Sequence, residues 1–565
     1  MQIIKSLVIF IILFVPIFLK AQTTYVQQDS RDEHFMDRMQ TFFPGNQSFF
    51  TTTKPFSRKY MIESMAERDS IFKAWGGSER TSSKHKVDFY NLKSLCSDHA
   101  EWLTDSSFLL PSKKSVLHTF YKNKSNFFEI KRPDFFLAVN PVIHIRMGKD
   151  QSDDKTLYLN ARGVTVRGEI AHRIGFSSTI TDQQERGPLF FQEQVFSSRA
   201  VPGVGFYKFF KKDSSAQDYF DGRGYITFKA TRYVDIQFGY DKNFIGNGYR
   251  SLFLSDWGNS YLFAKLNTKI WKFNYQNLFM ELNPQFTKRG DSLLKRKYAA
   301  MHHLSINVTP WLDLGFFEGV IFGRKDRFDF QYLNPVIFYR HIEGTIGSPD
   351  NAIAGFDFKA TVRKRVQLYG QLLLDEFIIS KIRNNPTYWA NKFGFQFGAK
   401  YFNAFGIPNL DLQGELNRVR PFTYSHNDTI NNYTHYNQPL AHPLGANFNE
   451  LCGIIRYQPI PKLRIFAMLQ HYVKGLDKDS SNFGGNIFRS YLTRRSEEGF
   501  RIGSGDRFVC TNAILRTSYE WKQNLFLEGG VQWRSAYDAV LDQKTNSTIL
   551  FFGLRLNMFT RSYDF

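Results

Sequence analysis

Cysteine is scarce in this sequence: Cys96, Cys452 and Cys510 are its three cysteines in 565 residues. An odd number without a CxxC pair predicts no disulfide framework, and no Cys or His spacing suits a metal ion. Cys452 and Cys510 lie in strand-like runs. We interpret them as isolated strand residues, although pairing between them is the alternative, and we expect no metal and no cofactor.

Long hydrophobic runs are also missing, apart from one at the start. Residues 6–19 form an apolar run behind Lys5, and Leu19 and Ala21 fit the −3 and −1 sites of a signal peptidase. The run is shorter than the roughly 20 apolar residues that a spanning helix needs. We interpret residues 1–21 as a signal peptide, with a retained membrane anchor as the alternative. Export excludes nucleic acid as the partner of this basic chain.

Aromatic residues, in contrast, are abundant. They make up 17% of the chain beside 22% charged residues, a mixture typical of membrane barrels with an apolar outer face, a polar lumen and aromatic girdles. From about residue 136 apolar and polar side chains alternate, as in residues 270–276, 365–375, 462–469 and 524–534. This period of two predicts β-strands, and the sequence therefore predicts an all-β transmembrane β-barrel over residues 136–565.

The length of that region sets the strand number. A strand of about 10 residues with its share of turn and loop uses roughly 24 residues, which gives about 18 antiparallel strands. Polar insertions at residues 181–221, 384–391, 422–447 and 475–506 predict extracellular loops, because barrel loops are long outside and short inside.

Residues 22–135 show a different pattern. Apolar residues recur every three or four positions in residues 88–103, and residues 57–75 form a second candidate helix with Ser57 as its N-cap. We expect this region to be a small helical plug on the periplasmic side of an outer-membrane barrel.

The final strand is predicted from an apolar face and a polar face. The apolar face contains Leu550, Phe552, Leu554, Leu556 and Met558; the other contains Gly553, Arg555 and Asn557. With Phe565 at the end, this pattern resembles the signal that barrel-assembly machinery recognises, and we expect that machinery as a partner.

The formal net charge is +21. For an exported barrel, lipopolysaccharide with the outer-membrane lipid, or an acidic surface polysaccharide, is the expected counter-charge. The alternative is that Lys and Arg simply line the loops and the lumen.

Four segments stand out by their motifs: residues 240–256, with the turn Gly246-Asn247-Gly248, and residues 330–343, 348–357 and 438–450. Together, in this order, they resemble the Wzi-like capsule-assembly barrels of Bacteroidetes, close to the group called gliding motility protein RemB. The resemblance covers most of the chain after the leader. It implies an outer-membrane barrel with a periplasmic helical plug that binds surface polysaccharide and, in some members, has a part in gliding motility.

The first segment supplies the candidate binding site. Its polar and aromatic groups are Asp241, Lys242, Asn247, Tyr249, Arg250 and Asp256. Hydroxyl-rich ligands take bidentate hydrogen bonds from such groups, and an acidic polymer would be held by Arg or Lys. The alternative is that these residues form the salt-bridged lumen that any wide barrel needs.

Catalysis is not expected. His303 and Ser305 share a strand face, as in outer-membrane phospholipases, but Ile306-Asn307-Val308 stands where Asn-Gly should follow the serine. We therefore expect a binding and assembly protein, with a channel for solute or polymer export as the alternative and a phospholipase-type enzyme as the weaker one.

Overall fold

The computed structural model describes residues 24–26, 31–44, 49–66, 85–103, 108–110, 112, 117, 119–210, 215–284, 293–336, 338–347, 350–376, 379–478 and 480–565. The predicted signal peptide lies outside these residues.

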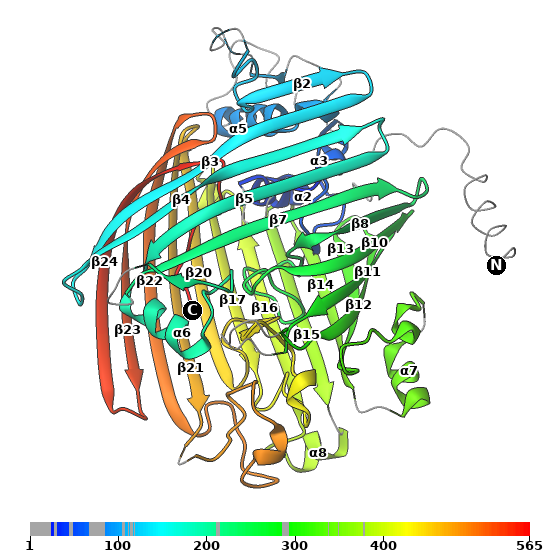
Figure 1. The fold of residues 1–565 in the computed structure, drawn as a ribbon, viewed down its shortest axis with the longest axis vertical. Coiled ribbons are helices and arrows are strands. Elements are labelled where there is room, and N and C mark those ends of the chain that lie inside the picture. The colour runs from blue at the N-terminus through cyan, green and yellow to red at the C-terminus, as the bar shows by residue number, and fades with distance from the viewer. Residues whose placement is uncertain are drawn as a thin grey trace, which may run out of the picture.

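Within the described residues, 18 antiparallel strands close into a barrel (Figure 1). They are β3(Phe135–Asp150), β4(Thr156–Ile170), β5(Ile174–Arg186), β7(Gln217–Lys229), β8(Val234–Asp241), β10(Tyr261–Ile270), β11(Phe273–Leu282), β12(Lys297–Thr309), β13(Leu312–Phe322), β14(Asn351–Val362), β15(Val366–Glu376), β16(Lys392–Tyr401), β17(Leu410–Val419), β20(Phe448–Ile460), β21(Leu463–Leu476), β22(Asp506–Lys522), β23(Leu525–Asp538) and β24(Gln543–Leu556). The seam is β24 against β3, and two short strands, β2(Phe128–Arg132) and β6(Lys208–Phe209), pair with β3 and β7. The predicted fold class and strand number are confirmed.

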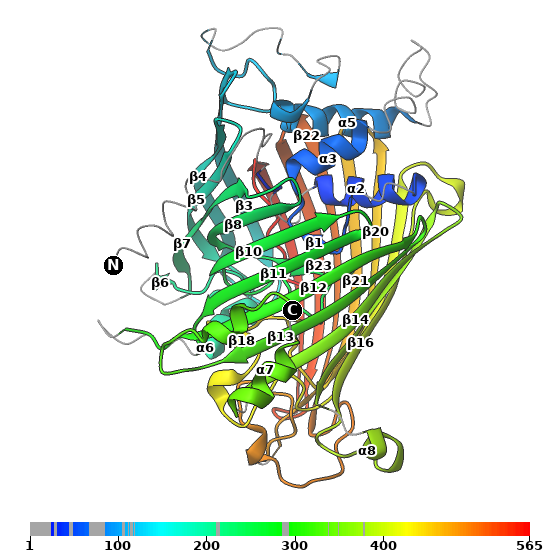
Figure 2. The same cartoon turned by 90° about the vertical axis from the view of Figure 1, so that its right-hand side faces the viewer.

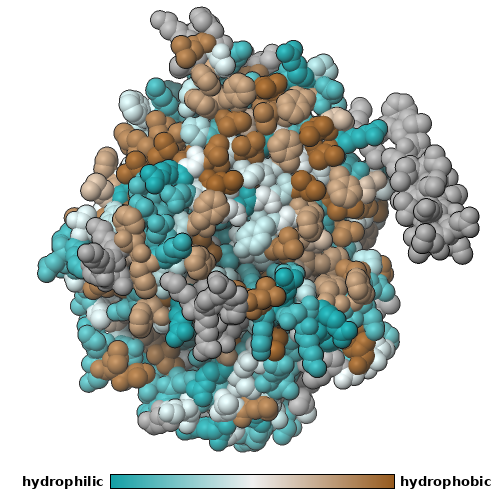
Figure 3. Space-filling view, viewed as in Figure 1, coloured by the Kyte–Doolittle hydropathy of each residue, from teal (hydrophilic) through white to brown (hydrophobic). Residues whose placement is uncertain are grey.

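Alternation along the strands separates the two faces of the wall. On β24, Leu550 and Phe552 are 57% and 65% exposed, whereas Glu528 and Gln532 on β23 point inward and are buried. In Figure 3 apolar residues gather over the upper part of the wall, and polar residues gather at the lower end, where long loops lie. An outward apolar face around a polar lumen is the pattern of a membrane-spanning barrel.

One predicted strand window is wrong. Residues 270–276 were expected to form one strand, but Trp271 and Lys272 form the turn between β10 and β11, and Trp271 has a φ of 51°. Within β11 the alternation holds, because Asn274 and Gln276 are buried on the lumen side.

The two rims of the barrel differ in loop length. Turns such as those at residues 171–173, 271–272 and 461–462 are short and share one rim. The long connections share the other rim, which carries α6(Leu189–Ser198) and α8(Ile379–Asn384). The loops predicted at 422–447 and 475–506 have nearly the observed bounds, but residues 420–447 fold into the lumen instead of extending from the barrel. The loop predicted at 181–221 is too long, because β5 continues to Arg186 and β7 begins at Gln217.

Three helices fill the lumen at the short-turn rim: α2(Arg31–Phe42), α3(Arg58–Ala66) and α5(Lys86–Asp98) (Figures 1 and 2). The helix expected within 88–103 is thus confirmed as α5, and Ser57 caps α3 by accepting a hydrogen bond of 3.2 Å from the Tyr60 backbone. The part of the second helix expected beyond Ala66 lies outside the described residues. Among the described helices, none is long and apolar enough to cross a bilayer.

Ion pairs and hydrogen bonds attach these helices to the inner wall. Arg31 contacts Glu520 at 2.8 Å on one side of the barrel, and Asp37 contacts Lys400 at 2.6 Å. The helices also share an apolar core, with Met36, Met39 and Leu95 fully buried. We call residues 24–103 the helical plug.

The segment after the last strand departs from prediction. β24 ends at Leu556, so Met558 does not continue its apolar face, and Phe565 does not end a strand. Residues 557–565, which we call the tail, turn back into the lumen, where Phe565 packs edge-on against Trp257. Tyr563 and Asp564 have buried polar partners there. They would lack these partners if the tail continued β24 as a strand of the wall.

A second departure lies outside the barrel. Residues 324–336 and 338–347, including α7(Tyr339–Ile346), fold over the outer wall of β12 and β13 (Figure 2). The carboxylate of Glu318 accepts hydrogen bonds from the Tyr339 and Arg340 backbone, and the His302 ring packs on the Tyr339 ring at 4.0 Å. The motif at 330–343 therefore covers polar groups that would otherwise face lipid.

Candidate functional site in the lumen

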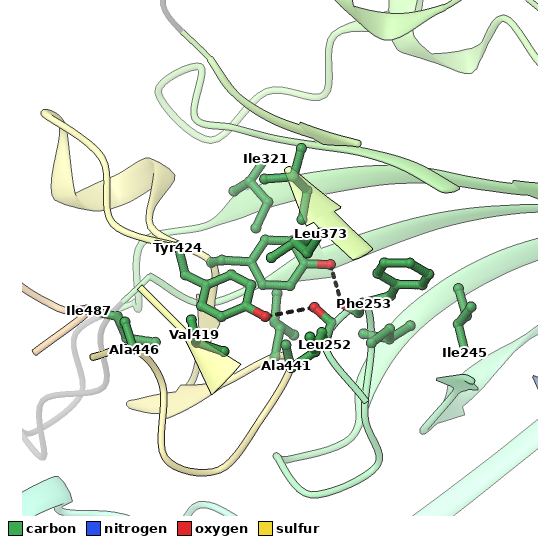
Figure 4. Packing of buried hydrophobic residues seen from close by; sticks show 14 of the residues in the cluster. Ile245, Leu252, Phe253, Ile321, Leu373, Val419, Tyr424, Ala441, Ala446 and Ile487 are labelled. Atoms are coloured by element: carbon green, nitrogen blue, oxygen red, sulfur yellow. Dashed lines mark hydrogen bonds between the residues drawn. The ribbon is translucent and has the colours of Figure 1, made fainter. Parts of the chain in front are cut away.

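Two layers close the lumen and leave a chamber between them. The first layer is the helical plug. The second consists of residues 242–260, which cross the lumen, together with the tail and residues 420–447. In Figure 4 Tyr424 lies against Leu252, and the hydroxyls of Tyr424 and Tyr433 each donate a 2.7 Å hydrogen bond to the backbone of residues 252–253. Short strands β1(Thr53–Lys54) and β9(Phe244–Ile245) join the two layers.

The chamber has a volume of about 620 Å³, within the range of small-ligand sites. Fourteen Lys or Arg residues and eight Asp or Glu residues line it. The lining is therefore polar, with an excess of basic groups.

Five of the six predicted site residues line this chamber: Asp241, Lys242, Tyr249, Arg250 and Asp256. Asn247 does not. Its side chain lies under the plug, where its oxygen accepts from Thr51 at 3.0 Å and its amide donates to Thr52 at 3.1 Å.

Lys242 follows directly after β8 and is held by backbone oxygens. Its ammonium donates to the carbonyls of Gly203 at 2.7 Å and Asp256 at 3.0 Å. Burial, reinforced by the nearby Arg223, lowers the pKa of Lys242 to about 7. Asp241 accepts from the Lys242 backbone at 2.8 Å, so the two residues brace the start of the crossing segment.

Gly248 allows the crossing segment to approach the wall. The backbone N–H groups of Tyr249 and Arg250 donate to the two carboxylate oxygens of Glu415 at 2.6 and 3.0 Å. A Cβ at Gly248 would lie 2.6 Å from the same carboxylate, so a glycine is required at this close approach.

Arg250 then joins the crossing segment to the tail. Its guanidinium lies 3.2 Å from Asp564 and 3.6 Å from Glu450, and Tyr249 donates its hydroxyl proton to Asp564. Burial lowers the pKa of His442. Its Nδ1 accepts a hydrogen bond from the Leu444 backbone at 3.2 Å, so its Nε2–H donates to Glu450 at 2.7 Å. Arg250 is committed to this internal network, which supports the lumen interpretation for this residue.

Sequence reasoning missed a row of residues on the opposite wall. Arg456, Phe466 and Arg516 are direct cross-strand neighbours on β20, β21 and β22, and all three line the chamber. Their strands were predicted, but their common level follows only from the pairing register, which a single sequence does not contain.

The His303 and Ser305 pair has a third member. His303 Nε2 lies 2.7 Å from Asp357, and Ser305 Oγ lies 3.2 Å from His303 Nδ1. All three are buried, beneath the stacked rings of Phe253 and Phe317, and none lines the chamber. The hydrogen-bond chain from Ser305 through His303 to Asp357 has the arrangement of a hydrolase triad, but these side chains are buried, whereas a catalytic serine must be reachable by its substrate.

Wall, lumen and plug together define the class: an outer-membrane type of β-barrel whose lumen is filled by its own chain. Comparison with known proteins narrows this class of barrel further. Residues 222–489 match the family of the capsule assembly protein Wzi. All four motifs lie within this match, which confirms the resemblance drawn from them. The narrower likeness to the RemB group stays a prediction.

One solved structure supports the fold. The chain is similar to Wzi of Escherichia coli, a carbohydrate-binding β-barrel involved in group 1 capsule assembly, at 13% identity and a TM-score of 0.55, over 95% of this chain and 100% of that one. OprD of Pseudomonas aeruginosa matches at 8% identity and a TM-score of 0.41, over 74% of this chain and 95% of that one. OccAB2 of Acinetobacter baumannii matches at 9% identity and 0.40, over 74% and 97%. Among curated proteins, none matches the chain.

Proposed function

We propose that this barrel binds surface polysaccharide and attaches capsule or exopolysaccharide to the outer membrane, without chemical turnover. The observation that carries the proposal is the basic luminal chamber of a chain that matches the Wzi family over residues 222–489. A chamber lined by planar guanidinium groups and aromatic rings suits acidic sugars, since guanidinium binds carboxylates through paired hydrogen bonds.

A glycan array tests this function. The purified full chain in detergent is applied to arrayed acidic and neutral polysaccharides, with a boiled sample as the control for unfolded basic protein. We expect binding to acidic polymers that the boiled sample does not show. Equal signals from folded and boiled protein, or no signal at all, would contradict the proposal.

A channel is the second candidate, because wide barrels of this size conduct when their lumen is open. The two layers that close this lumen argue against it. In planar bilayers we expect no single-channel steps from the wild-type barrel. Stable conductance steps would favour the channel.

The cellular partners extend the same proposal. Lipopolysaccharide and outer-membrane lipid surround the wall, and barrel-assembly machinery inserts it; the position of Phe565 in the lumen means that such machinery would read β24 itself. From the resemblance to the RemB group we also propose a part in gliding motility. If a deletion strain retains less polysaccharide but glides normally, the proposed part in gliding motility is wrong, while the proposed polysaccharide binding stands.

A further inference from the structure

The rim with the short turns carries a continuous surface of exposed aromatic and basic side chains. Four neighbouring turns, with the strand ends beside them, contribute to it: residues 271–272, 308–311, 362–365 and 402–409. Backbone hydrogen bonds of 2.7–2.9 Å join each turn to the next, from Asn307 to Lys272, from Thr361 to Trp311 and from Phe402 to Arg365. We call these four turns the basic rim.

Large aromatic side chains are exposed on the basic rim. Trp271, Trp311 and Phe405 are 72%, 52% and 76% exposed. The outer wall next to them is apolar, with Phe273 and Phe316 also exposed. In membrane barrels, aromatic rings at the edge of the apolar band lie at the level of the lipid headgroups. The basic rim therefore lies where the apolar wall meets the membrane surface.

The charge on the basic rim has one sign. Its four turns contain Lys272, Arg363, Lys364 and Arg365 and no acidic residue. Lys272 is engaged, since its ammonium donates to a backbone oxygen of the next turn at 3.3 Å and lies 5.4 Å from the Trp271 ring centroid. The other three side chains are exposed, and within the part of the chain that the structure describes, no hydrogen bond, ion pair or ring contact engages them. Three cations are thus available to an anionic partner.

The turn between β14 and β15 does not itself call for these cations. Arg363 and Lys364 have φ values of 50° and 53°, which Asn and Gly adopt at lower cost in a tight hairpin turn. Turn chemistry therefore does not explain why two long basic side chains occupy these positions, whereas binding of an anion does.

The combination of exposed rings and unpaired cations favours one kind of anion. An acidic polymer in water would use the cations but not the exposed indole rings. An anionic phospholipid uses both, because its phosphate meets Lys and Arg while aromatic rings lie at the boundary between headgroups and acyl chains. We infer that the basic rim binds the headgroups of anionic phospholipids in the adjoining leaflet. This interaction goes beyond the proposed polysaccharide binding and does not depend on it.

Native mass spectrometry of the full chain released from detergent tests the inference. The probes are dioleoylphosphatidylglycerol and the zwitterionic dioleoylphosphatidylcholine. We expect the wild type to bind phosphatidylglycerol in preference. The triple variant Arg363→Gln, Lys364→Gln and Arg365→Gln should bind it at least tenfold more weakly. Arg363→Lys plus Arg365→Lys should bind it nearly as tightly as the wild type, because the headgroup attracts either cation.

A second triple variant removes the same charge from the opposite rim. It combines Arg501→Gln, Arg507→Gln and Lys544→Gln, three exposed side chains that no contact engages among the described residues. We expect this control to bind phosphatidylglycerol like the wild type. Unboiled gel migration shows that each variant is a folded barrel.

Three results would overturn the inference. If both lipids bind the wild type equally, the anionic headgroup is wrong. If the two triple variants lose phosphatidylglycerol equally, net charge decides the binding and the basic rim is wrong. If polygalacturonate binds the wild type, phosphatidylglycerol does not, and the Arg363–Arg365 variant loses the polymer, the partner is an acidic polymer instead of a lipid. The glycan array, run on the same variants, decides the proposed function separately.

Discussion

Arg250 Nη1 lies 3.2 Å from the carboxylate of Asp564, across the middle of the lumen. The two residues come from segments that are 314 positions apart in sequence. Their ion pair fixes the tail against the crossing segment, and Glu450 on β20 completes the charge balance. This pair explains why the last residues lie inside the barrel instead of extending its wall.

Arg250→Ala should destabilise the barrel. The substitution leaves the buried carboxylates of Glu450 and Asp564 without their shared cation, which costs about 3–5 kcal/mol for a buried pair. We expect less heat-modifiable barrel and a lower melting temperature, and any loss of polysaccharide should follow the loss of folded protein. Arg250→Lys should keep part of the stability. Full levels of folded Arg250→Ala barrel with lost polymer would instead make Arg250 a ligand residue.

Substitutions in the last strand, β24, test which of its side chains face the lipid and which face the lumen. Leu554 pairs with Leu527 and Ile145 on the outer face, so Leu554→Arg should destabilise the barrel, by at most the about 2–4 kcal/mol that an arginine costs at the bilayer midplane. Arg555→Leu should also be harmful, since Arg555 holds the buried Glu528 at 2.6 Å. Adding Glu528→Gln to Arg555→Leu should restore much of the stability, whereas the same addition should not help Leu554→Arg. Rescue of both, or of neither, in unfolding titrations would contradict this register.

The third prediction concerns which loops are accessible at the cell surface. Both loops 422–447 and 475–506 share the long-loop rim, but Tyr424, Tyr433 and their neighbours are buried in the lumen, while Arg495 and Arg501 are exposed. Proteinase K, which cuts with broad specificity, should therefore cut near Arg495 and Arg501 when added to intact cells and spare residues 422–447. Cleavage near Arg495 only after cell lysis would place that rim in the periplasm.

The buried Ser305, His303 and Asp357 cluster should behave as structure. Ser305→Ala removes one hydrogen bond, worth about 0.5–1.5 kcal/mol, whereas His303→Ala leaves the Asp357 carboxylate without its partner and should cost more. Neither the wild type nor Ser305→Ala should hydrolyse phospholipid vesicles. Hydrolysis by the wild type that Ser305→Ala abolishes would make the cluster an active site.

The barrel could be predicted because the sequence pattern that marks each strand lies within that strand. Alternation along β15 and β23 follows from lipid on one side and a polar lumen on the other, so each strand carries its own signal. The turn at Trp271 and Lys272 was missed because it contains no Gly, Asn or Pro to mark it. The tail was missed because polar and aromatic residues alternate there as they do in a wall strand.

The candidate site depended on contacts that the sequence does not encode locally. The Gly246-Asn247-Gly248 turn directed attention to the crossing segment, and five of its six chosen residues line the chamber. Arg250 could not be recognised as an internal ion-pair residue, since Asp564 and Glu450 are remote in sequence. Arg456 and Arg516 likewise become neighbours of one ring only through the register of three strands.

The most direct test is polysaccharide retention by whole cells. A deletion strain is complemented with the wild-type gene or with an empty vector, and surface-bound acidic polysaccharide is measured per cell. We predict that the wild-type gene restores retention and that the empty vector does not. Retention in the deletion strain equal to that of the wild type would contradict the account.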